Sequence, residues 1–269
     1  MKHKTTKERK PEHVLYLGDW VFHVGPTFIE TPFGTETKDA DLHFYGKRMV
    51  EAIEPLADVT SLANWELYRL EPGKLEAFLD RSACLVISDV EAKCFHLYPS
   101  FFNRAQRDNK VVTFPDRLKV IKNWIESGGG MMMLGGWLSF SGVQGRSGWG
   151  RSLMAPALPV NCLSSEDLVE SSEGFTSEVM IPDHPAVQGL PWETFPPLFG
   201  YNEVTAKSDA DVIVRVKETG DPLLVAGRFG KGRILTYMSD PAPHWGINFE
   251  LWEGYDKFWR QSLTWVKKH

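Results

Sequence analysis

The sequence has no long hydrophobic run, little cysteine and no excess of positive charge, and each absence excludes a class of function. No window approaches the roughly 18 apolar residues that a membrane-spanning helix requires. The 269 residues carry a net charge of -5, which gives no electrostatic footprint for nucleic acid. We therefore expect neither a membrane partner nor a nucleic-acid partner.

Cysteine is scarce, and its positions match no zinc or redox motif. The chain has three, Cys84, Cys94 and Cys162, a set that suits a reducing compartment, so we expect a cytoplasmic protein without a bound metal or cofactor. The basic start is not followed by an apolar signal core, because Pro11 and Glu12 intervene. We expect residues 1–12 to be a disordered basic tail.

The stretch from Gly128 to Gly142 organises the rest of the chain. Four consecutive large apolar residues, Met131–Leu134, run without polar alternation up to Gly135 and Gly136. This pattern predicts a buried central strand of an α/β sheet with a sharp turn at its carboxyl end. Ligands of open α/β sheets bind outside the carboxyl ends of the strands, so we expect this turn to lie at the functional site.

The other apolar runs predict alternating strands and helices. Strands are expected at 13–17, 58–62 and 81–90, helices at 41–56, 72–79 and 115–127, and a long loop at 20–39. Strands at 211–217, 222–228 and 234–238 are expected to extend the sheet in antiparallel fashion before a closing helix at 249–268. This order predicts a mainly parallel α/β sheet, with residues 13–269 as a single domain.

Acidic residues and histidines follow the predicted strands. Asp19, Asp89 and Asp240 each come after an apolar run, and the histidines of loops rich in glycine or proline are His23, His184 and His244. Carboxyl ends of parallel strands meet at one edge of a sheet, where acids and imidazoles can transfer protons or hold a metal. The alternative is that each acid caps a turn and each imidazole fills a hydrogen-bonded niche. We take Asp19, Asp240 and His244 as the strongest candidates, with the last two as a catalytic pair.

Loop residues near the central turn supply further pocket candidates. Trp137 and Trp245 lie beside glycine in predicted loops, where an indole either lines a pocket or packs the loop. Arg146 suits an anionic ligand, with a solvated loop as the alternative. Ser139 lies past the sharpest point of the turn, where it would not be exposed as a nucleophile, and it remains a pocket candidate.

Four groups of motifs occur in order along the chain. They are Gly128–Gly142, then Gly148-Trp149-Gly150, then Asp183-His184-Pro185 with Gly189-Leu190-Pro191, and finally Gly230-Lys231-Gly232-Arg233 with the run 239–246. Together they resemble the glutamine amidotransferase-like family of the class I glutamine amidotransferase-like superfamily, near the trehalose-utilisation-type proteins. The resemblance spans about residues 13–266. It implies a flavodoxin-like three-layer sandwich whose nucleophile elbow follows the central strand.

The residues depart from the chemistry that this resemblance implies. A working class I amidotransferase has a Cys on the strained turn, in a pattern like Gly-x-Cys-x-Gly, and a His oriented by a Glu two residues later. Here the Cys position falls on Trp137, or on Gly136 with a one-residue slip. His244 stands where the catalytic His is expected, but Gly246 takes the place of the Glu. We therefore expect no glutaminase activity.

Two hypotheses remain open from the sequence. The first is a non-catalytic protein, an amidotransferase-like pseudoenzyme that binds a small polar ligand or forms an assembly, with a homo-oligomer as the expected assembly. The second is a Cys-independent hydrolase or isomerase that acts on a sugar-like substrate through Asp240 and His244. The hypotheses differ in whether His244 is needed for turnover.

Overall fold

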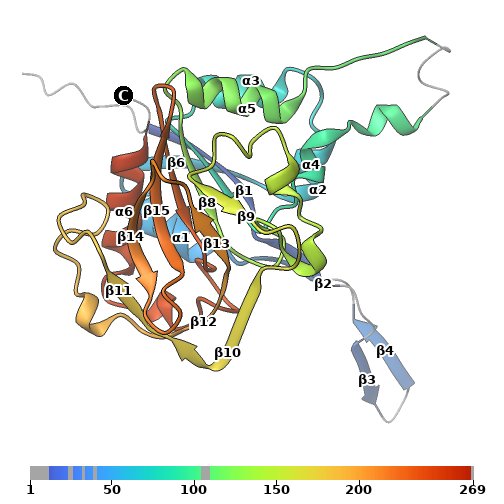
Figure 1. Ribbon diagram of the computed structural model, residues 1–269. Helices are drawn as coiled ribbons and strands as arrows, with labels where there is room; N and C mark the ends of the chain where they lie inside the picture. Colours follow the sequence, from blue (N-terminus) through green and yellow to red (C-terminus); the bar gives the residue numbers. More distant parts are fainter. Residues whose placement is uncertain (1–11, 24–26, 32–33, 39–40, 104–109, 268–269) are drawn as a thin grey trace, which may run out of the picture.

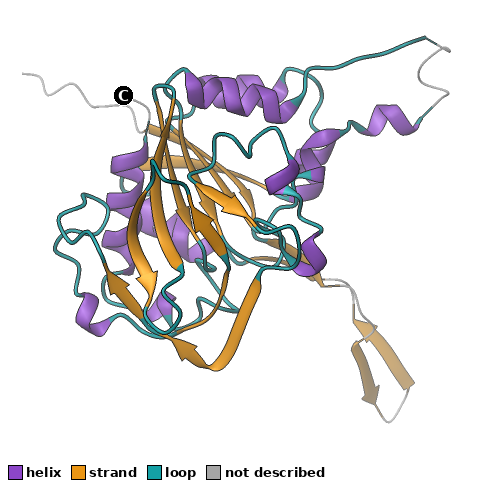
Figure 2. Cartoon of the chain, in the orientation of Figure 1, coloured by secondary structure: helices purple, strands orange, loops and turns teal. Residues whose placement is uncertain are grey.

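The computed structural model describes residues 12–23, 27–31, 34–38, 41–103 and 110–267, and its centre is an eight-stranded sheet (Figure 1). The strands lie in the order β11-β14-β15-β16-β8-β7-β1-β6. Their bounds, in that order, are Ser177–Val179, Asp211–Val216, Pro222–Phe229, Gly232–Tyr237, Gly130–Leu134, Cys84–Ser88, Glu12–Gly18 and Ala57–Leu62. The strands form the middle of the molecule and the helices its periphery (Figure 2).

The sheet is parallel on one side and antiparallel on the other. Strands β16, β8, β7, β1 and β6 run parallel, whereas β15, β14 and β11 each pair in antiparallel fashion. This confirms the predicted α/β architecture with antiparallel C-terminal strands, which is consistent with a flavodoxin-like fold. One detail differs from the prediction: β16 joins the sheet through a parallel pairing with β8, so the antiparallel part begins at β15.

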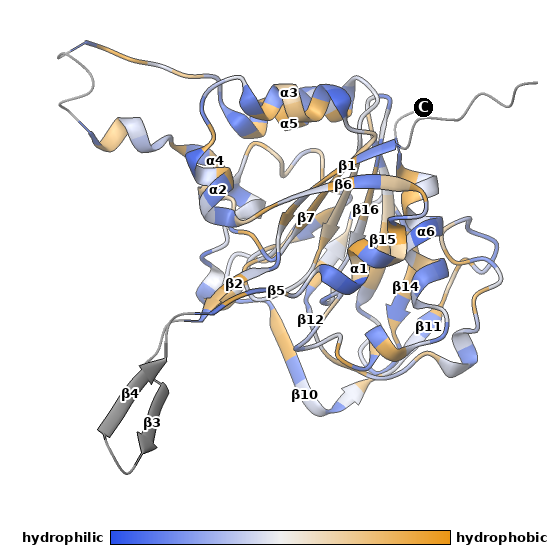
Figure 3. Ribbon diagram, turned by 180° about the vertical axis from the view of Figure 1, so that it is seen from behind, coloured by the Kyte–Doolittle hydropathy of each residue, from blue (hydrophilic) through white to orange (hydrophobic). Residues whose placement is uncertain are grey.

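Six α-helices flank the sheet in the described part of the chain: α1 (Lys47–Ile53), α2 (Asn64–Arg69), α3 (Lys74–Arg81), α4 (Lys93–His96), α5 (Arg117–Glu126) and α6 (Tyr255–Val266). Helices α1 and α6 pack together behind the sheet in Figure 1 and in front of it in Figure 3. Both α3 and α5 alternate hydrophobic and hydrophilic residues in Figure 3, which is typical of helices with one face on a core. None of the helices in the described ranges is long and apolar enough to cross a membrane.

The predicted central strand is completely buried, as is its neighbour β7. All five residues of β8 are buried, because strands pair on both sides and the two faces are covered. A continuous apolar run is what such a position requires. The side chain of Asp116 caps α5 just before this strand by accepting a hydrogen bond from the Lys119 amide at 3.0 Å.

The segment between β1 and α1 was predicted wrongly. The loop expected at 20–39 contains β2 (Trp20–His23), β3 (Thr27–Thr31) and β4 (Gly34–Lys38), and the helix expected from Asp41 begins only at Lys47. Residues Asp41–Phe44 form β5, which pairs with β2 in antiparallel fashion. This ribbon is largely exposed, so it carries no buried apolar stripe that would mark it in the sequence.

Two further two-stranded pairs were not predicted as such. Strand β9 (Val160–Cys162) pairs with β13 (Val204–Ala206), and β10 (Leu168–Phe175) pairs with β12 (Leu198–Asn202). The closing helix is also shorter than predicted, because Trp252 is extended and α6 starts at Tyr255. The predicted basic tail lies outside the described residues except for Glu12, which begins β1.

Candidate functional site

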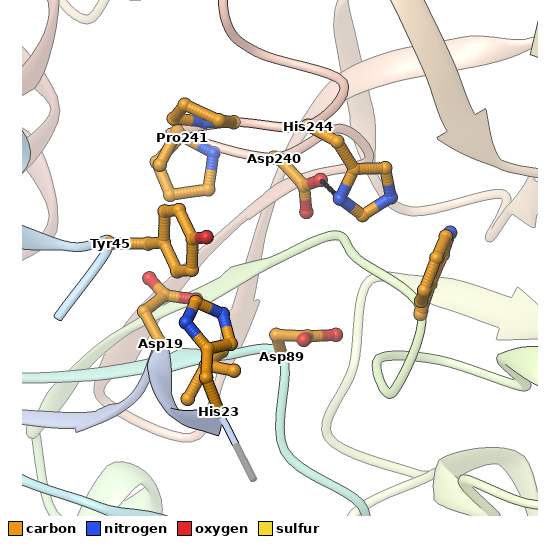
Figure 4. A pocket seen from close by; sticks show the side chains of 11 residues that line it. Asp19, His23, Tyr45, Asp89, Asp240, Pro241 and His244 are labelled. Carbon is orange, nitrogen blue, oxygen red and sulfur yellow. Dashed lines mark ion pairs between the residues drawn. The ribbon is translucent and has the colours of Figure 1, made fainter. Parts of the chain in front are cut away.

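A cavity of about 310 Å³ opens at the carboxyl ends of the parallel strands. Five of the residues proposed from the sequence line it, namely Asp19, His23, Trp137, Asp240 and His244. Asp89 and Tyr45 line it as well, although neither was among the selected site residues. Asp19, Asp89 and Asp240 surround the same space in Figure 4, with Tyr45 and His23 beside Asp19. We call this space the acidic cavity.

The strand register explains how the acids meet. Gly18 of β1 lies opposite Ser88 of β7, so the next residues, Asp19 and Asp89, leave the sheet side by side. Both have a left-handed backbone, with φ of 54° and 50°, which Asp adopts more readily than most residues. Asp240 follows β16, on the other side of β8 from β7. The three carboxyl groups therefore converge from three strands.

Two of these carboxyl groups are only half satisfied by the protein. Asp89 accepts a hydrogen bond from the Leu138 amide through Oδ1 at 2.6 Å, and Asp240 accepts one from the Trp245 amide through Oδ2 at 3.3 Å. Within the described residues, Oδ2 of Asp89 and Oδ1 of Asp240 accept no hydrogen bond. The third group, Asp19, accepts a hydrogen bond from the Tyr16 hydroxyl.

Burial perturbs the acidity of all three groups. It raises the pKa of Asp19 to about 6 and that of Asp89 to about 7. Burial, followed by repulsion from the other two carboxylates, raises the pKa of Asp240 well above its ordinary value. Carboxyl groups with raised pKa values that share a cavity are typical of sites that transfer protons or bind ligands.

His244 lies at the rim of the acidic cavity, beside Asp240. Its Nδ1 is 3.5 Å from Oδ2 of Asp240, and its ring centroid is 4.3 Å from that of Trp137. Burial lowers the pKa of His244. A carboxyl group whose pKa is raised thus faces an imidazole whose pKa is lowered, which is an arrangement suited to an acid and a base at neutral pH.

The turn after β8 has its sharpest point at Gly136. This residue has φ of +134°, and a Cβ atom built there would lie 2.5 Å from Oδ1 of Asp89 and 2.7 Å from Oδ1 of Asp240. The buried side chain of Asn202 holds the turn from both sides: its Oδ1 accepts from the Gly136 amide at 3.0 Å, and its Nδ2 donates to the Gly136 carbonyl at 3.1 Å. Carboxyl oxygens therefore fill the space that a side chain would need at Gly136, one of the two positions that the resemblance allows for the Cys.

A model of the family described as "Putative glutamine amidotransferase" matches residues 35–268. The chain belongs to this family. Its amidotransferase-like fold is similar to Cytoplasmic Protein STM3548 from Salmonella typhimurium, with 29% identity, a TM-score of 0.82 and coverage of 95% of this chain and 99% of that one. Cytoplasmic Protein STM1381 from Salmonella typhimurium LT2 gives 29% identity, a TM-score of 0.81 and coverage of 95% and 100%.

A more distant similarity concerns the fold alone. A ThuA-like protein from Bacteroides uniformis shares 10% identity with a TM-score of 0.50, over 95% of this chain and 94% of that one. None of the curated proteins matches the chain.

The position at which the resemblance places the triad Glu, Gly246, has no space for a side chain either. A Cβ atom on Gly246 would collide with the backbone carbonyl of Asp240 and lie 2.8 Å from that of Ala242. A side chain at this position therefore requires the backbone at Asp240 and Ala242 to shift. The carboxyl group that lies beside the His244 imidazole is instead that of Asp240.

Several other residues proposed from the sequence lie outside the acidic cavity or only support its wall. Ser139 is fully buried and donates to the Leu134 carbonyl at 2.6 Å, so it ties the turn to the end of β8. The amide of Gly135 donates to the Tyr237 carbonyl at 2.7 Å. Arg146 pairs with Glu91 at 2.9 Å, and His184 packs on Trp265 with centroids 5.0 Å apart. Neither Arg146 nor His184 lines the cavity.

A second hollow of about 290 Å³ shares His244 with the acidic cavity. Trp245 lines it and donates from its indole nitrogen to Oε1 of Glu170 at 2.7 Å. The indole nitrogen of Trp137 donates to the same oxygen at 3.0 Å. Glu170 thus fixes two indoles that both lie near the His244 ring, and no local feature of the sequence marked it. No three His, Cys, Asp or Glu side chains in the described ranges form a group that could hold a metal ion.

Proposed function

We propose that this protein has no glutaminase activity and binds a small polar ligand in the acidic cavity. The observation that carries the proposal is the occupation of the elbow: oxygens of Asp89 and Asp240 fill the space beside Gly136 that a nucleophile needs. The two carboxyl oxygens without partners are the groups available to a ligand. Neither oxygen is completely buried, so both can be reached from the cavity, and a ligand that donates hydrogen bonds to them gains affinity.

None of the three cysteines is placed to act as a nucleophile in the acidic cavity. Cys84 is fully buried within β7, Cys94 lies in α4 and Cys162 lies in β9, and none of them lines the acidic cavity. Burial raises the pKa of all three thiols. A raised pKa disfavours the thiolate, which is the nucleophilic form.

We expect the purified protein to release no more glutamate from glutamine than the heat-denatured protein does. The variant Gly136→Cys with Gly246→Glu, which restores the residue types of the triad, is expected to remain inactive because both new side chains meet filled space. A coupled glutamate assay measures both, with a working amidotransferase as the positive control. Glutamate release by the wild-type protein would contradict the proposal.

An enzyme of different chemistry is the second candidate. It is favoured by the proximity of His244 Nδ1 to Asp240. The pKa of Asp240 is raised and that of His244 is lowered. Such a pair can donate one proton and accept another, as hydrolysis or isomerisation of a sugar-like substrate requires.

One experiment separates the two candidates. The wild-type protein is incubated with sugars, amino acids and amines, and both melting temperature and product formation are measured. Binding without turnover is expected. If turnover occurs, His244→Ala is expected to lower it at least about 100-fold, while His184→Ala, which is remote from the cavity, leaves it unchanged. Equal turnover in wild type and His244→Ala would exclude this pair as the acid and base.

We also propose that the protein acts in the cytoplasm and that residues 13–269 form one domain. Support for the location is the cytoplasmic description of the two Salmonella proteins with 29% identity. Support for one domain is the hydrophobic core, whose buried residues run from Val14 to Val266 in one cluster. A homo-oligomer remains a proposal that size-exclusion chromatography with light scattering tests.

A further inference from the structure

The charge of the acidic cavity is one-sided. Among the described residues, its lining includes three carboxyl groups, Asp19, Asp89 and Asp240, and no lysine or arginine. The nearby basic residues Lys93 and Arg146 are engaged with Glu91, at 2.6 and 2.9 Å. An anionic ligand would therefore meet only repulsion among the charged groups that line the cavity.

The hydrogen-bonding groups of the acidic cavity are complementary to a ligand that donates hydrogen bonds. Asp240 is 5% exposed and presents Oδ1 to the cavity without a partner among the described residues, and Oδ2 of Asp89 also has no partner among them. A cation bound beside these two groups favours their ionised form, and an ionised carboxyl group only accepts hydrogen bonds. The complementary ligand group thus carries several N–H or O–H donors directed at two oxygens.

Aromatic and apolar surfaces complete the lining. Trp137 is 47% exposed although it is a large hydrophobic residue, and Tyr45 and the run 241–243 also line the cavity. Indole and phenol rings attract cations through their faces, more strongly where water is excluded. The same surfaces accommodate an alkyl chain.

We propose that the acidic cavity binds a small organic cation, a primary amine or a guanidine attached to a short apolar chain. This inference rests on the proposed function and names its ligand class. The cationic group donates to the free oxygens of Asp89 and Asp240, and its chain lies against Trp137 and Pro241. A neutral polyol could supply the donors but would leave the buried negative charge uncompensated, which makes it the weaker ligand.

The test compares cations with neutral molecules of the same shape. Butylamine, 1,5-diaminopentane and butylguanidine are titrated beside butanol, 1,5-pentanediol and butylurea, by calorimetry and by thermal shift. At least one cation is expected to bind ten or more times more tightly than its neutral counterpart. Asp240→Asn is expected to abolish this difference, whereas Asp183→Asn, which removes the same charge from an exposed turn, is expected to keep it.

The outcomes distinguish the inference from the function on which it rests. If a neutral compound binds as tightly as its cationic counterpart, and Asp240→Asn weakens it, the ligand class is wrong and the binding function stands. If no compound, including glucose and inorganic phosphate, shows binding that depends on Asp240 or Trp137, both are wrong. A cation effect equal in Asp240→Asn and Asp183→Asn is attraction to the whole acidic protein and also overturns the inference.

Discussion

At pH 8 the Asp89→Asn variant is expected to melt about 5 °C higher than the wild-type protein, an effect of about 2 kcal/mol. The amide oxygen can still accept the hydrogen bond from Leu138, and the amide carries no charge to repel Asp19 and Asp240. In the wild-type protein, burial and repulsion from neighbouring carboxylates both destabilise the ionised form of Asp89. Differential scanning calorimetry measures the difference.

The pH dependence of this gain has a defined sign. Burial raises the pKa of Asp89 in the folded state to about 7, so between pH 4 and 7 the folded protein binds more protons than the unfolded chain. The wild-type protein therefore loses stability as pH rises through this window. The gain from Asp89→Asn should be full at pH 8 and disappear near pH 4. Asp19 and Glu91 repel the Asp89 carboxylate, and the pKa of Asp19, which burial raises to about 6, lies in the same window.

A matched exposed substitution separates this effect from a general change of net charge. Asp183→Asn should leave the melting temperature within about 1 °C at every pH. A destabilised Asp89→Asn at pH 8 would mean that its carboxylate is held by groups other than those described.

Asn202→Leu is expected to lower the free energy of unfolding by about 3 to 5 kcal/mol. The substitution keeps the size of the side chain but removes bonds to the Gly136 amide, the Gly136 carbonyl and Oδ1 of Asp167. All of these groups are buried, so water cannot replace the lost partners. Chemical denaturation measures the change, with an unchanged m-value expected if the fold is kept.

The control is Asn248→Leu, in a partly buried loop. Its amide makes one hydrogen bond, to the Pro197 carbonyl at 3.3 Å, so we expect a loss of about 1 kcal/mol. Equal losses in the two variants would show that Asn202 does not hold the turn at Gly136. Asn202→Leu should also weaken ligand binding, because Gly136 places the turn against Asp89 and Asp240.

The sheet was predictable because its strands are buried. Runs such as Met131–Leu134 are apolar without interruption, and an acid follows two neighbouring strands at the same register, as Asp19 and Asp89 do. The strand-end rule thus located Asp19 and Asp240. It applied equally to Asp89, which was recognised as following a strand but was not selected as a site residue.

The residues that were missed depend on contacts that no local pattern encodes. Tyr45 was assigned to a helix, because the ribbon of β2 and β5 is too exposed to show a buried stripe. Glu170 meets Trp137 and Trp245 across 33 and 75 residues of chain, and Asn202 meets Gly136 across 66. Such partners become visible only when the sheet brings the segments together.

The filled space beside Gly136 also bears on which side chains this turn can accept. Any side chain at Gly136 must displace the carboxyl groups of both Asp89 and Asp240, and the positive φ of Gly136 is one that other residues rarely adopt. A Glu at Gly246 must displace the backbone at Asp240 and Ala242. Each of these changes alone strains its surroundings, so we expect Gly136→Cys and Gly246→Glu each to lower the free energy of unfolding. A nucleophile at Gly136 is therefore compatible only with smaller side chains at positions 89 and 240.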